Sequence, residues 1–595
     1  MLAFLPRLRR FALAPRTEPQ PASTTLRTHH PAWVVVLVSI WLATVCNVPL
    51  WREVAQLPGQ GSLRGWGFTV AFALMVAAGN AALLSLVAWR WTLKPAVLVL
   101  VLMAAFGAYF MLAYGIVVDA SMLVNVMQTD VKETGDLLNG RMLGTVLVLA
   151  APPLLWLYRR PLRRLRTMGH VLHNGLLLVG SAVVIVVCLL LVFQDFASTM
   201  RNHTKLRYLI NPLNTVYALG HIASKPLRMD TSTLQPLGRD AQLGASYAGQ
   251  TQPPLVVLVL GETGRSVNFG LNGYTRDTTP ELSARTDLVS ARNAWACGTS
   301  TAASLPCMFS NLGRTGFEAR SVNSENLIDV LHHAGLAVLW LDNQAGCKGV
   351  CDRIGETRAN ALKDPVQCPG GECLDEVMLT ELDAKIAALP AEQRARGTVV
   401  VLHQMGSHGP AYYKRSATVR KKFQPECTST SLQECDRQQV VNAYDNSIVE
   451  TDYFLNLVLK RLEVLGTSSQ TAMIYAADHG ESLGENNLYL HGLPYAVAPD
   501  VQKNVPWITW LSPAMQVRAG VTTGCLQKDQ TTRRISHDNY FHSVLGLLDV
   551  KTSAYNPDLD TFAPCRSKTL GLGSTPAAGE TARATPQARG LKPVG

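Results

Sequence analysis

The sequence predicts two domains, an N-terminal transmembrane domain of five helices and a C-terminal α/β domain with a mainly parallel central sheet. Five apolar runs lie within the first third of the 595 residues. Beyond about residue 253, short apolar strands alternate with longer amphipathic segments, which is the pattern of a parallel sheet with crossover helices. With 48% hydrophobic and 16% charged residues, the chain is too apolar for a disordered protein.

Four of the five apolar runs have the length of a membrane span, because a helix needs about 20 apolar residues to cross the hydrocarbon core. The fourth run is shorter and contains Pro152 and Pro153, so we expect it to be kinked or tilted. The first run lacks a small-residue cleavage site and is interpreted as an anchor. The runs cover about residues 33–51, 66–89, 96–118, 142–158 and 174–194.

Three clusters of basic residues carry the whole net charge of +11, and each flanks an apolar run. They lie in residues 1–32, 90–94 and 158–170. This is the positive-inside pattern of a membrane protein and not a nucleic-acid groove, so no nucleic-acid partner is expected. With these clusters in the cytoplasm, an odd number of spans puts the chain beyond about residue 195 outside the membrane, in a periplasm-like compartment. If one span were miscounted, the large C-terminal domain would lie in the cytoplasm instead.

Cysteine spacing tests this orientation independently. Eight of the twelve cysteines form four close pairs, which suits disulfides in an oxidising compartment. Zinc knuckles or reduced thiols are the alternative, but no pair stands with the histidines that a Cys/His zinc site uses. Cys525 and Cys565 are candidates for a fifth, longer bridge. The close pairs are Cys297–Cys307, Cys347–Cys351, Cys368–Cys373 and Cys427–Cys435.

Composition divides the chain into five segments. The polar ends predict a cytoplasmic arm at the N-terminus and a disordered tail at the C-terminus. A turn-rich stretch between the two domains predicts membrane-surface helices and a linker. The expected ranges are 1–32 for the arm, 33–194 for the transmembrane domain, 195–252 for the surface helices and linker, 253–570 for the α/β domain outside the membrane and 571–595 for the tail.

Polar residues gather where the predicted strands of the C-terminal domain end. Buried strands are expected at 255–260, 337–341, 398–402 and 472–476. Glu262 follows the first strand, His408 lies in the loop after the third, and Asp478, His479 and His491 follow the fourth. The carboxyl ends of parallel strands share one edge, where ligands bind. Carboxylates and histidines brought together there predict a catalytic zinc site, although each motif alone is commonplace.

The segment CGTSTAASLPC at 297–307 offers hydroxyl groups at the expected start of a helix. The amides and dipole of a helix N-terminus favour an anion such as phosphate. Coordination to zinc would lower the pKa of a hydroxyl there. A capping cluster without chemistry is the alternative. Composition alone leaves the choice among Thr299, Ser300 and Thr301 open.

Several long segments in one order resemble the lipid A phosphoethanolamine transferases, the family that includes the mobile colistin-resistance enzymes and belongs to the alkaline phosphatase and sulfatase superfamily. The resemblance runs from about residue 33 to 550. It implies an alkaline-phosphatase-like fold for the C-terminal domain. The motifs that carry it are GETGRSVNFGLNGY, CGTSTAASLPCMFS, DNQAGCKGVCDR, HQMGSHGPAYYKR, NAYDNSI and DHGESLGENNLYLHG.

The resemblance also implies roles for single residues. Thr301 would be the nucleophile, and His408 and His491 would act in catalysis or hold a second zinc ion. Gln344 stands where some relatives carry an asparagine, so an amide contact to the donor headgroup is expected. The implied ligands of the first zinc ion are Glu262, Thr301, Asp478 and His479. The implied substrate-binding residues are Asn125, Thr129, Glu133, Gln344, Lys348, His408 and His491.

The function implied by the resemblance is a zinc-dependent ping-pong transfer of phosphoethanolamine from phosphatidylethanolamine to a lipid A phosphate. It would lower the negative charge of the outer membrane and give polymyxin (colistin) resistance. Other acceptors are a core sugar, a glucan or a protein. A periplasmic phosphodiesterase or sulfatase-like hydrolase is a further alternative, although Thr301 cannot mature as a sulfatase nucleophile does. A non-catalytic scaffold is disfavoured by the intact site. We expect a monomer surrounded by inner-membrane lipids.

Overall fold

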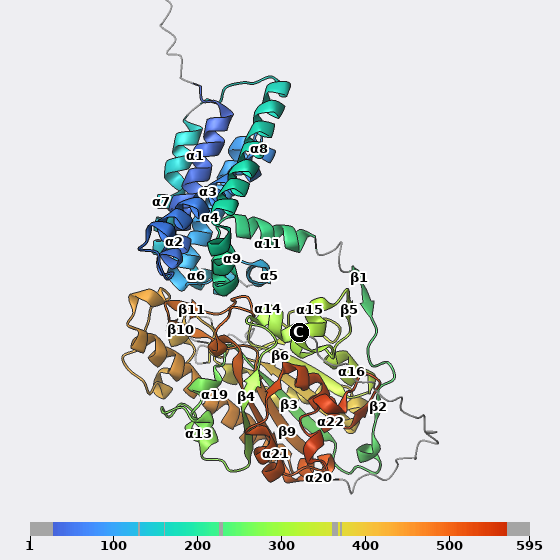
Figure 1. The fold of residues 1–595 in the computed structure, drawn as a ribbon. Coiled ribbons are helices and arrows are strands. Elements are labelled where there is room, and N and C mark those ends of the chain that lie inside the picture. The colour runs from blue at the N-terminus through green and yellow to red at the C-terminus, as the bar shows by residue number, and fades with distance from the viewer. Residues whose placement is uncertain are drawn as a thin grey trace, which may run out of the picture. The chain divides into compact units, whose positions relative to one another are not determined.

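The computed structural model describes residues 28–128, 131–159, 161–224, 230–359, 367–368 and 372–567. The chain forms two compact units, which Figure 1 shows as a helical unit and a sheet-containing unit. Most of the arm predicted at 1–32 and the whole tail predicted at 571–595 lie outside the described residues. The first unit comprises Met1–Leu112 and Asn139–Tyr217, and the second comprises Ala113–Leu138 and Ala218–Gly595.

The first unit is a bundle that contains, within the described residues, five helical spans long and apolar enough to cross a membrane. This confirms the predicted number. Pro152 and Pro153 lie inside the fourth span, which is nevertheless a continuous helix. The spans are Pro31–Ala55, α3 (Leu63–Leu86), α4 (Leu93–Tyr114), α7 (Gly140–Tyr158) and α8 (Thr167–Leu191). The first span consists of α1 (Pro31–Thr44), a 3-10 turn η1 (Val45–Asn47) and α2 (Val48–Ala55).

A buried pair of amides ties the bundle to the segment that follows it. The backbone N–H of Asn211 donates to Asn47 Oδ1 at 2.9 Å, and the side-chain amide of Asn211 donates to the carbonyl of Ala104 at 2.7 Å. Polar groups inside an apolar bundle must be satisfied internally, so these bonds specify one packing. The following helices are α9 (Phe193–Asn202), α10 (Lys205–Tyr208) and α11 (Leu213–Ala223).

The stretch predicted as surface helices and linker also contains two strands of the second unit. Strand β1 (Asp230–Gln235) pairs with β5 (Val322–Ser324), and β2 (Gln242–Leu243) pairs with β14 (Val550–Lys551). These strands are short and largely polar, so hydrophobic periodicity does not indicate them.

The second unit is built on an eight-stranded sheet with the order β13-β4-β12-β9-β3-β8-β6-β7. Strand β12 runs antiparallel to both neighbours, and the other pairings are parallel, which confirms a mainly parallel sheet. The strands are β3 (Pro254–Gly261), β4 (Leu288–Trp295), β6 (Ala337–Asp342), β7 (Thr357–Arg358), β8 (Thr398–His403), β9 (Gln470–Ala477), β12 (Asn504–Leu511) and β13 (Ile535–Ser536).

The four strands predicted from the sequence are β3, β6, β8 and β9, which lie side by side in the middle of the sheet (Figure 1). Every residue of β3 and β8 is buried, as expected for central strands covered on both faces. Because these strands are parallel, their carboxyl ends lie at one edge, and the candidate site is built there.

Helices pack around this sheet, and the longest begins with a reciprocal capping box between Asp436 and Gln439. The helices are α13 (Pro280–Ser283), α14 (Thr301–Met308), α15 (Gly313–Ala319), α16 (Leu327–His333), α17 (Leu382–Ala387), α18 (Ala391–Arg396), α19 (Arg437–Leu465), α20 (Pro513–Ala519), α21 (Thr523–Gln530) and α22 (Tyr540–Leu547). Strands β10 (Ser482–Glu485) and β11 (Leu488–Leu490) form a separate antiparallel pair.

Residues 113–138 belong to the second unit, although the sequence analysis counted them within the transmembrane domain. They contain α5 (Ala120–Gln128) and α6 (Val131–Leu137). Helix α5 packs against α14, and Asp136 pairs with Lys414 at 2.7 Å. An apolar run in the sequence predicts a membrane span. It does not predict whether the polar segment between two runs packs against the membrane unit or against the second unit.

Disulfides join all five cysteine pairs considered from spacing, including the longer Cys525–Cys565 bridge. All five lie in the second unit, and the remaining two cysteines, Cys46 and Cys188, are buried free thiols. The other bridges are Cys297–Cys307, Cys347–Cys351, Cys368–Cys373 and Cys427–Cys435.

Candidate functional site

Four polar side chains meet at the carboxyl edge of the central sheet. Glu262 follows β3, Asp478 and His479 follow the neighbouring strand β9, and Thr301 is the first residue of α14. One ligand atom from each of Glu262, Asp478 and His479 lies within 4.8 Å of the others. All four residues are buried, with at most 4% of their surface exposed. The structure therefore gathers four residues from three places in the chain into one cluster.

Hydrogen bonds fix the orientation of the cluster. The hydroxyl of Thr301 donates to Glu262 Oε2 at 3.0 Å and lies 3.5 Å from His479 Nε2. That Nε2 atom is 3.4 Å from carboxylate oxygens of both Glu262 and Asp478. The other ring nitrogen of His479 lies 2.9 Å from the carbonyl oxygen of Gly480. A proton on that nitrogen would leave Nε2 free to act as a ligand.

The donor set fits a divalent cation. The Oδ2 atom of Asp478 is buried and accepts no hydrogen bond within the described part of the chain. A buried carboxylate oxygen that accepts no hydrogen bond is costly unless a cation compensates its charge. Two carboxylates, one imidazole and one hydroxyl match the nitrogen and oxygen donors that bind zinc.

The pKa shifts of the cluster residues also favour the binding of a cation. Burial and the charge of Glu262 raise the pKa of Asp478 to about 6. Burial alone would lower the pKa of His479, but Asp478 and Glu262 together raise it to about 10. Burial likewise opposes ionisation of Glu262, yet the hydrogen bond and charge of His479 keep its pKa well below the usual range. Two buried negative groups therefore create a site that attracts positive charge.

Of the three hydroxyl residues left open by composition, Thr301 is the one that faces the carboxylates. The hydroxyl of Thr299 instead donates to the carbonyl of Leu493 at 2.6 Å. Helix α14 is held in place by Ser304, whose hydroxyl donates to the carbonyl of Asp478 at 2.5 Å. Thr301 thus stands at the positive end of a helix, where an anion is favoured.

Two further histidines lie beside the cluster. The ring of His491 is 4.2 Å from that of His479, and the ring of His408 is 5.9 Å from that of His491, measured between centroids. His491 Nδ1 lies 3.2 Å from Glu481 Oε2. Glu481 is fully buried. Its contact with His491 cannot be predicted from the sequence, although it stands three residues after Asp478 in the same motif.

His408 is supported through its backbone. Arg415 Nε donates to the carbonyl oxygen of His408 at 3.0 Å. The side chain of Arg415 is 4% exposed, and its guanidinium forms ion pairs with Glu372 and Asp136. Arg415 ends the HQMGSHGPAYYKR motif, and nothing in the sequence pattern indicated this supporting contact.

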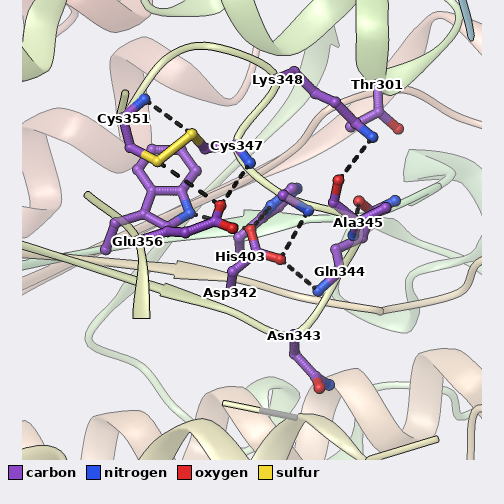
Figure 2. A network of polar contacts seen from close by, with 12 residues as sticks. Thr301, Asp342, Asn343, Gln344, Ala345, Cys347, Lys348, Cys351, Glu356 and His403 are labelled. Atoms are coloured by element: carbon purple, nitrogen blue, oxygen red, sulfur yellow. Dashed lines mark hydrogen bonds and ion pairs between the residues drawn. A yellow bond between two sulfur atoms is a disulfide. The ribbon is translucent and has the colours of Figure 1, made fainter. Parts of the chain in front are cut away.

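The loop after β6 is organised by the buried carboxylate of Asp342 (Figure 2). Its oxygens accept hydrogen bonds from the backbone N–H groups of Gln344 and Gly346 and lie 2.8 Å from His403 Nδ1. The side-chain amide of Gln344 reaches Glu262 Oε2 at 3.3 Å. Gln344 therefore contacts the cluster directly.

Lys348 lies in the same loop, which the Cys347–Cys351 disulfide closes (Figure 2). Its ammonium donates to the carbonyl oxygen of Ala345 and to that of Gln128, both at 3.1 Å. Gln128 is the last residue of α5. The lysine thus connects this loop to the segment expected to bind the donor lipid.

The resemblance implies that Asn125, Thr129 and Glu133 bind substrate, and their i, i+4, i+8 spacing would place them on one helical face. The structure describes this set only in part. Asn125 is half-buried on α5. Thr129 and the side chain of Glu133 lie outside the described residues. The role of these three residues in binding the donor lipid stays a prediction.

Two family models match the chain. Residues 71–227 match the model described as phosphoethanolamine transferase EptA/EptB, and residues 254–550 match the sulfatase model. The first match spans most of the helical unit, and the second covers the sheet and the site.

Individual proteins are similar over almost the whole chain. Phosphoethanolamine transferase EptA of Escherichia coli strain K12 is 37% identical, over 90% of this chain and 97% of that protein. Phosphatidylethanolamine transferase Mcr-1 of Escherichia coli is 34% identical, over 88% and 96% respectively. The solved structure of the integral membrane protein lipooligosaccharide phosphoethanolamine transferase A (EptA) from Neisseria meningitidis superposes with a TM-score of 0.85 at 32% identity, covering 91% of this chain and 100% of that one.

Proposed function

The chain belongs to the EptA family of phosphoethanolamine transferases, and on that premise we propose that it carries phosphoethanolamine from phosphatidylethanolamine to lipid A through Thr301. Two relatives support the donor and the acceptor, since one is named a phosphatidylethanolamine transferase and another a lipooligosaccharide phosphoethanolamine transferase. The observation that carries the proposal is the Thr301 hydroxyl 3.0 Å from Glu262, inside a buried cluster with Asp478 and His479.

One zinc ion would be held by the two carboxylates, the imidazole and the threonine hydroxyl of this cluster. Bound there, zinc would lower the pKa of the hydroxyl and neutralise charge that develops on the phosphoryl oxygens. His408 and His491 flank the cluster and would bind the phosphoryl group, or a second ion. Gln344 would hold Glu262 in position through its amide, and Lys348 would attract the donor phosphate.

The transfer runs in two displacements. In the first, the deprotonated oxygen of Thr301 forms a bond to the donor phosphorus, and the bond from phosphorus to the diacylglycerol oxygen breaks. His408 or His491 gives a proton to that leaving oxygen. In the second, a phosphate oxygen of lipid A attacks the same phosphorus, and the bond to Thr301 breaks. The threonine is regenerated and phosphoethanolamine stays on the acceptor.

The membrane unit has a physical purpose in this reaction. Donor and acceptor are both lipids, so a tethered catalytic unit searches a surface and not a volume, which raises the effective concentration. The basic clusters that flank the apolar runs in the sequence support an inner-membrane protein with its second unit in the periplasm. An added ethanolamine amine cancels negative charge on lipid A, so polymyxin resistance should follow.

The deciding experiment is mass spectrometry of lipid A from cells with and without this chain. A phosphoethanolamine-sized increment is expected with the wild-type protein and is lost with Thr301→Ala. Thr299→Ala is the matched control, because its hydroxyl bonds to Leu493 and not to the carboxylates. Full transfer by Thr301→Ala would contradict the covalent step. Free phosphoethanolamine released without a modified lipid A would indicate a hydrolase.

A further inference from the structure

A cavity of about 180 Å³ lies at one end of the helical unit. Its walls come from the start of α1, the turn between α3 and α4, and the connection from α7 to α8. These elements meet at the same end of the unit in Figure 1. The lining side chains that matter here are Trp89, Arg90, Lys94, Arg163, Arg164 and His170.

The charge around this cavity has one sign. Four of its lining side chains are cationic, and residues 86–100 and 155–191, which supply most of its walls, contain no aspartate or glutamate. Burial lowers the pKa of His30, just ahead of α1, and the positive charges of His173, Arg163 and His170 lower it further. A concave site lined by one sign of charge raises the local concentration of counter-ions, here anions.

A buried imidazole gives the cavity a specific polar group. His170 is 5% exposed, and its Nδ1 atom has no hydrogen-bond partner in the described structure. Its ring packs against Trp89 with centroids 5.8 Å apart. Buried polar atoms are normally paired, whereas this nitrogen lacks a polar partner among the described residues. When protonated, it would offer the cavity a buried donor for an acceptor such as a phosphate oxygen.

Hydrogen bonds between backbone groups hold the segments around the cavity together. The N–H of His29 donates to the carbonyl of Pro161 at 3.0 Å, and the N–H of Arg163 donates to the carbonyl of His29 at 2.9 Å. Helix α8 has 25 residues and begins without a side-chain cap, so its positive end adds to the potential of the same region. The positive-inside rule explains why basic residues lie here, but not why they surround a buried imidazole.

We propose that this cavity binds the phosphate of an anionic phospholipid headgroup, with phosphatidylglycerol or cardiolipin as the ligand class. The cavity is smaller than the roughly 300 Å³ of common small-molecule sites, so it suits a headgroup phosphate whose acyl chains lie along the helices. Trp89 is the interfacial residue expected beside such a headgroup. The cytoplasmic leaflet follows from the proposed orientation, but the site itself does not depend on the transfer reaction.

Native mass spectrometry of the full chain in detergent, titrated with phosphatidylglycerol, tests the site. Arg163→Gln with Arg164→Gln should weaken lipid retention by at least about tenfold. Arg159→Gln with Arg166→Gln is the matched control, because it removes two charges from the same connection outside the cavity lining. The control should stay within about twofold of the wild type. Equal losses in both double variants, or none in either, would overturn the proposal.

Two further arms separate the headgroup from other anions and the imidazole from its packing. His170→Phe keeps a ring against Trp89 but removes the nitrogen, and it should reduce retention with an unchanged unfolding temperature. If His170→Phe retains the lipid as well as the wild type does, the imidazole does not bind the headgroup, and that part of the proposal is wrong. Inorganic phosphate at millimolar concentration should not displace the lipid. Displacement at that concentration would mean a free-phosphate site and would overturn the lipid assignment.

Discussion

The ammonium group of Lys348 donates a hydrogen bond to the backbone carbonyl of Gln128 at 3.1 Å, although the two residues are 220 positions apart. Gln128 ends α5, and a cation at a helix C-terminus is favoured by the helix dipole. The contact fastens the loop after β6 to the 113–138 segment within the second unit. An arriving donor phosphate would compete with this carbonyl for the same ammonium.

The Cys347–Cys351 bridge should matter more for activity than for stability. It closes a separation of 4 residues, whereas Cys525–Cys565 closes one of 40. Loop-closure entropy gives about 2 kcal/mol for the first and about 4 kcal/mol for the second. Replacing both cysteines of the short bridge with serine frees the Lys348 loop, so we expect transfer to fall about tenfold with a small shift in unfolding temperature.

The Cys525→Ser/Cys565→Ser variant provides the contrast. It should lose more thermal stability while retaining most of its transfer activity below the unfolding transition. Lipid modification and thermal unfolding are measured on both variants. A short-bridge variant with wild-type turnover would show that the disulfide does not position Lys348.

Arg415 should position His408. Arg415→Lys keeps the buried charge for Glu372 and Asp136 but removes the Nε donor to the His408 carbonyl. A displaced His408 is expected to lower kcat by about tenfold. Lys414→Gln is the control, because Lys414 contacts the same two carboxylates without touching His408. If Lys414→Gln lowers kcat as much as Arg415→Lys, the effect comes from the ion pairs and not from His408.

Glu481 should orient His491. Glu481→Gln preserves size but replaces the carboxylate that faces His491 Nδ1 at 3.2 Å. Removing a partner that orients a site histidine typically costs about tenfold to a hundredfold in activity or metal affinity. Glu485→Gln, four residues further on in β10, removes a partner of Arg265 and should leave zinc affinity unchanged. Zinc titration and turnover are measured together, and equal zinc affinity and turnover in Glu481→Gln and wild type would refute the role.

A carboxyl pair away from the site should make stability depend on pH. Burial and the neighbouring Glu450 raise the pKa of Glu376 from 4.5 to about 7. Between these values the native state binds more protons than the unfolded state, so the free energy of unfolding falls as pH rises. Glu376→Gln removes this term, and its stability relative to wild type should rise by up to about 3 kcal/mol between pH 4 and 8.

Thermal unfolding of the full chain in detergent at both pH values measures that difference. Glu392→Gln on the exposed face of α18 serves as the control, with no change in its offset from wild type. A constant offset for Glu376→Gln across the range would contradict the raised pKa.

The cluster residues could be predicted because Glu262 and Asp478 directly follow buried apolar strands that become neighbours in a parallel sheet. The same argument fails for β4 and β12, whose sequences LVSARNAW and NVPWITWL mix polar residues or proline into the strand. Their pairing is set by tertiary contacts and not by local pattern.

Arg415 and Glu481 could not be assigned roles from the sequence for a related reason. Each acts through one hydrogen bond to a histidine, and the path of the intervening loop decides which bond forms. The position of 113–138 is a similar case, since its contacts with Lys348 and Lys414 come from residues more than 200 positions away. Periodicity within a segment carries no information about such partners.

The detour of residues 113–138 into the second unit has a practical consequence for anyone who trims this protein to ease purification. A fragment that begins near residue 230 retains Glu262, Thr301, Asp478 and His479 yet discards Gln128 and Asp136. We expect such a fragment to retain activity on small soluble esters but to lose most of its transfer activity on lipid substrates. Inhibitors selected against such a fragment would be optimised on a catalytic unit that lacks the contacts of Gln128 with Lys348 and of Asp136 with Lys414.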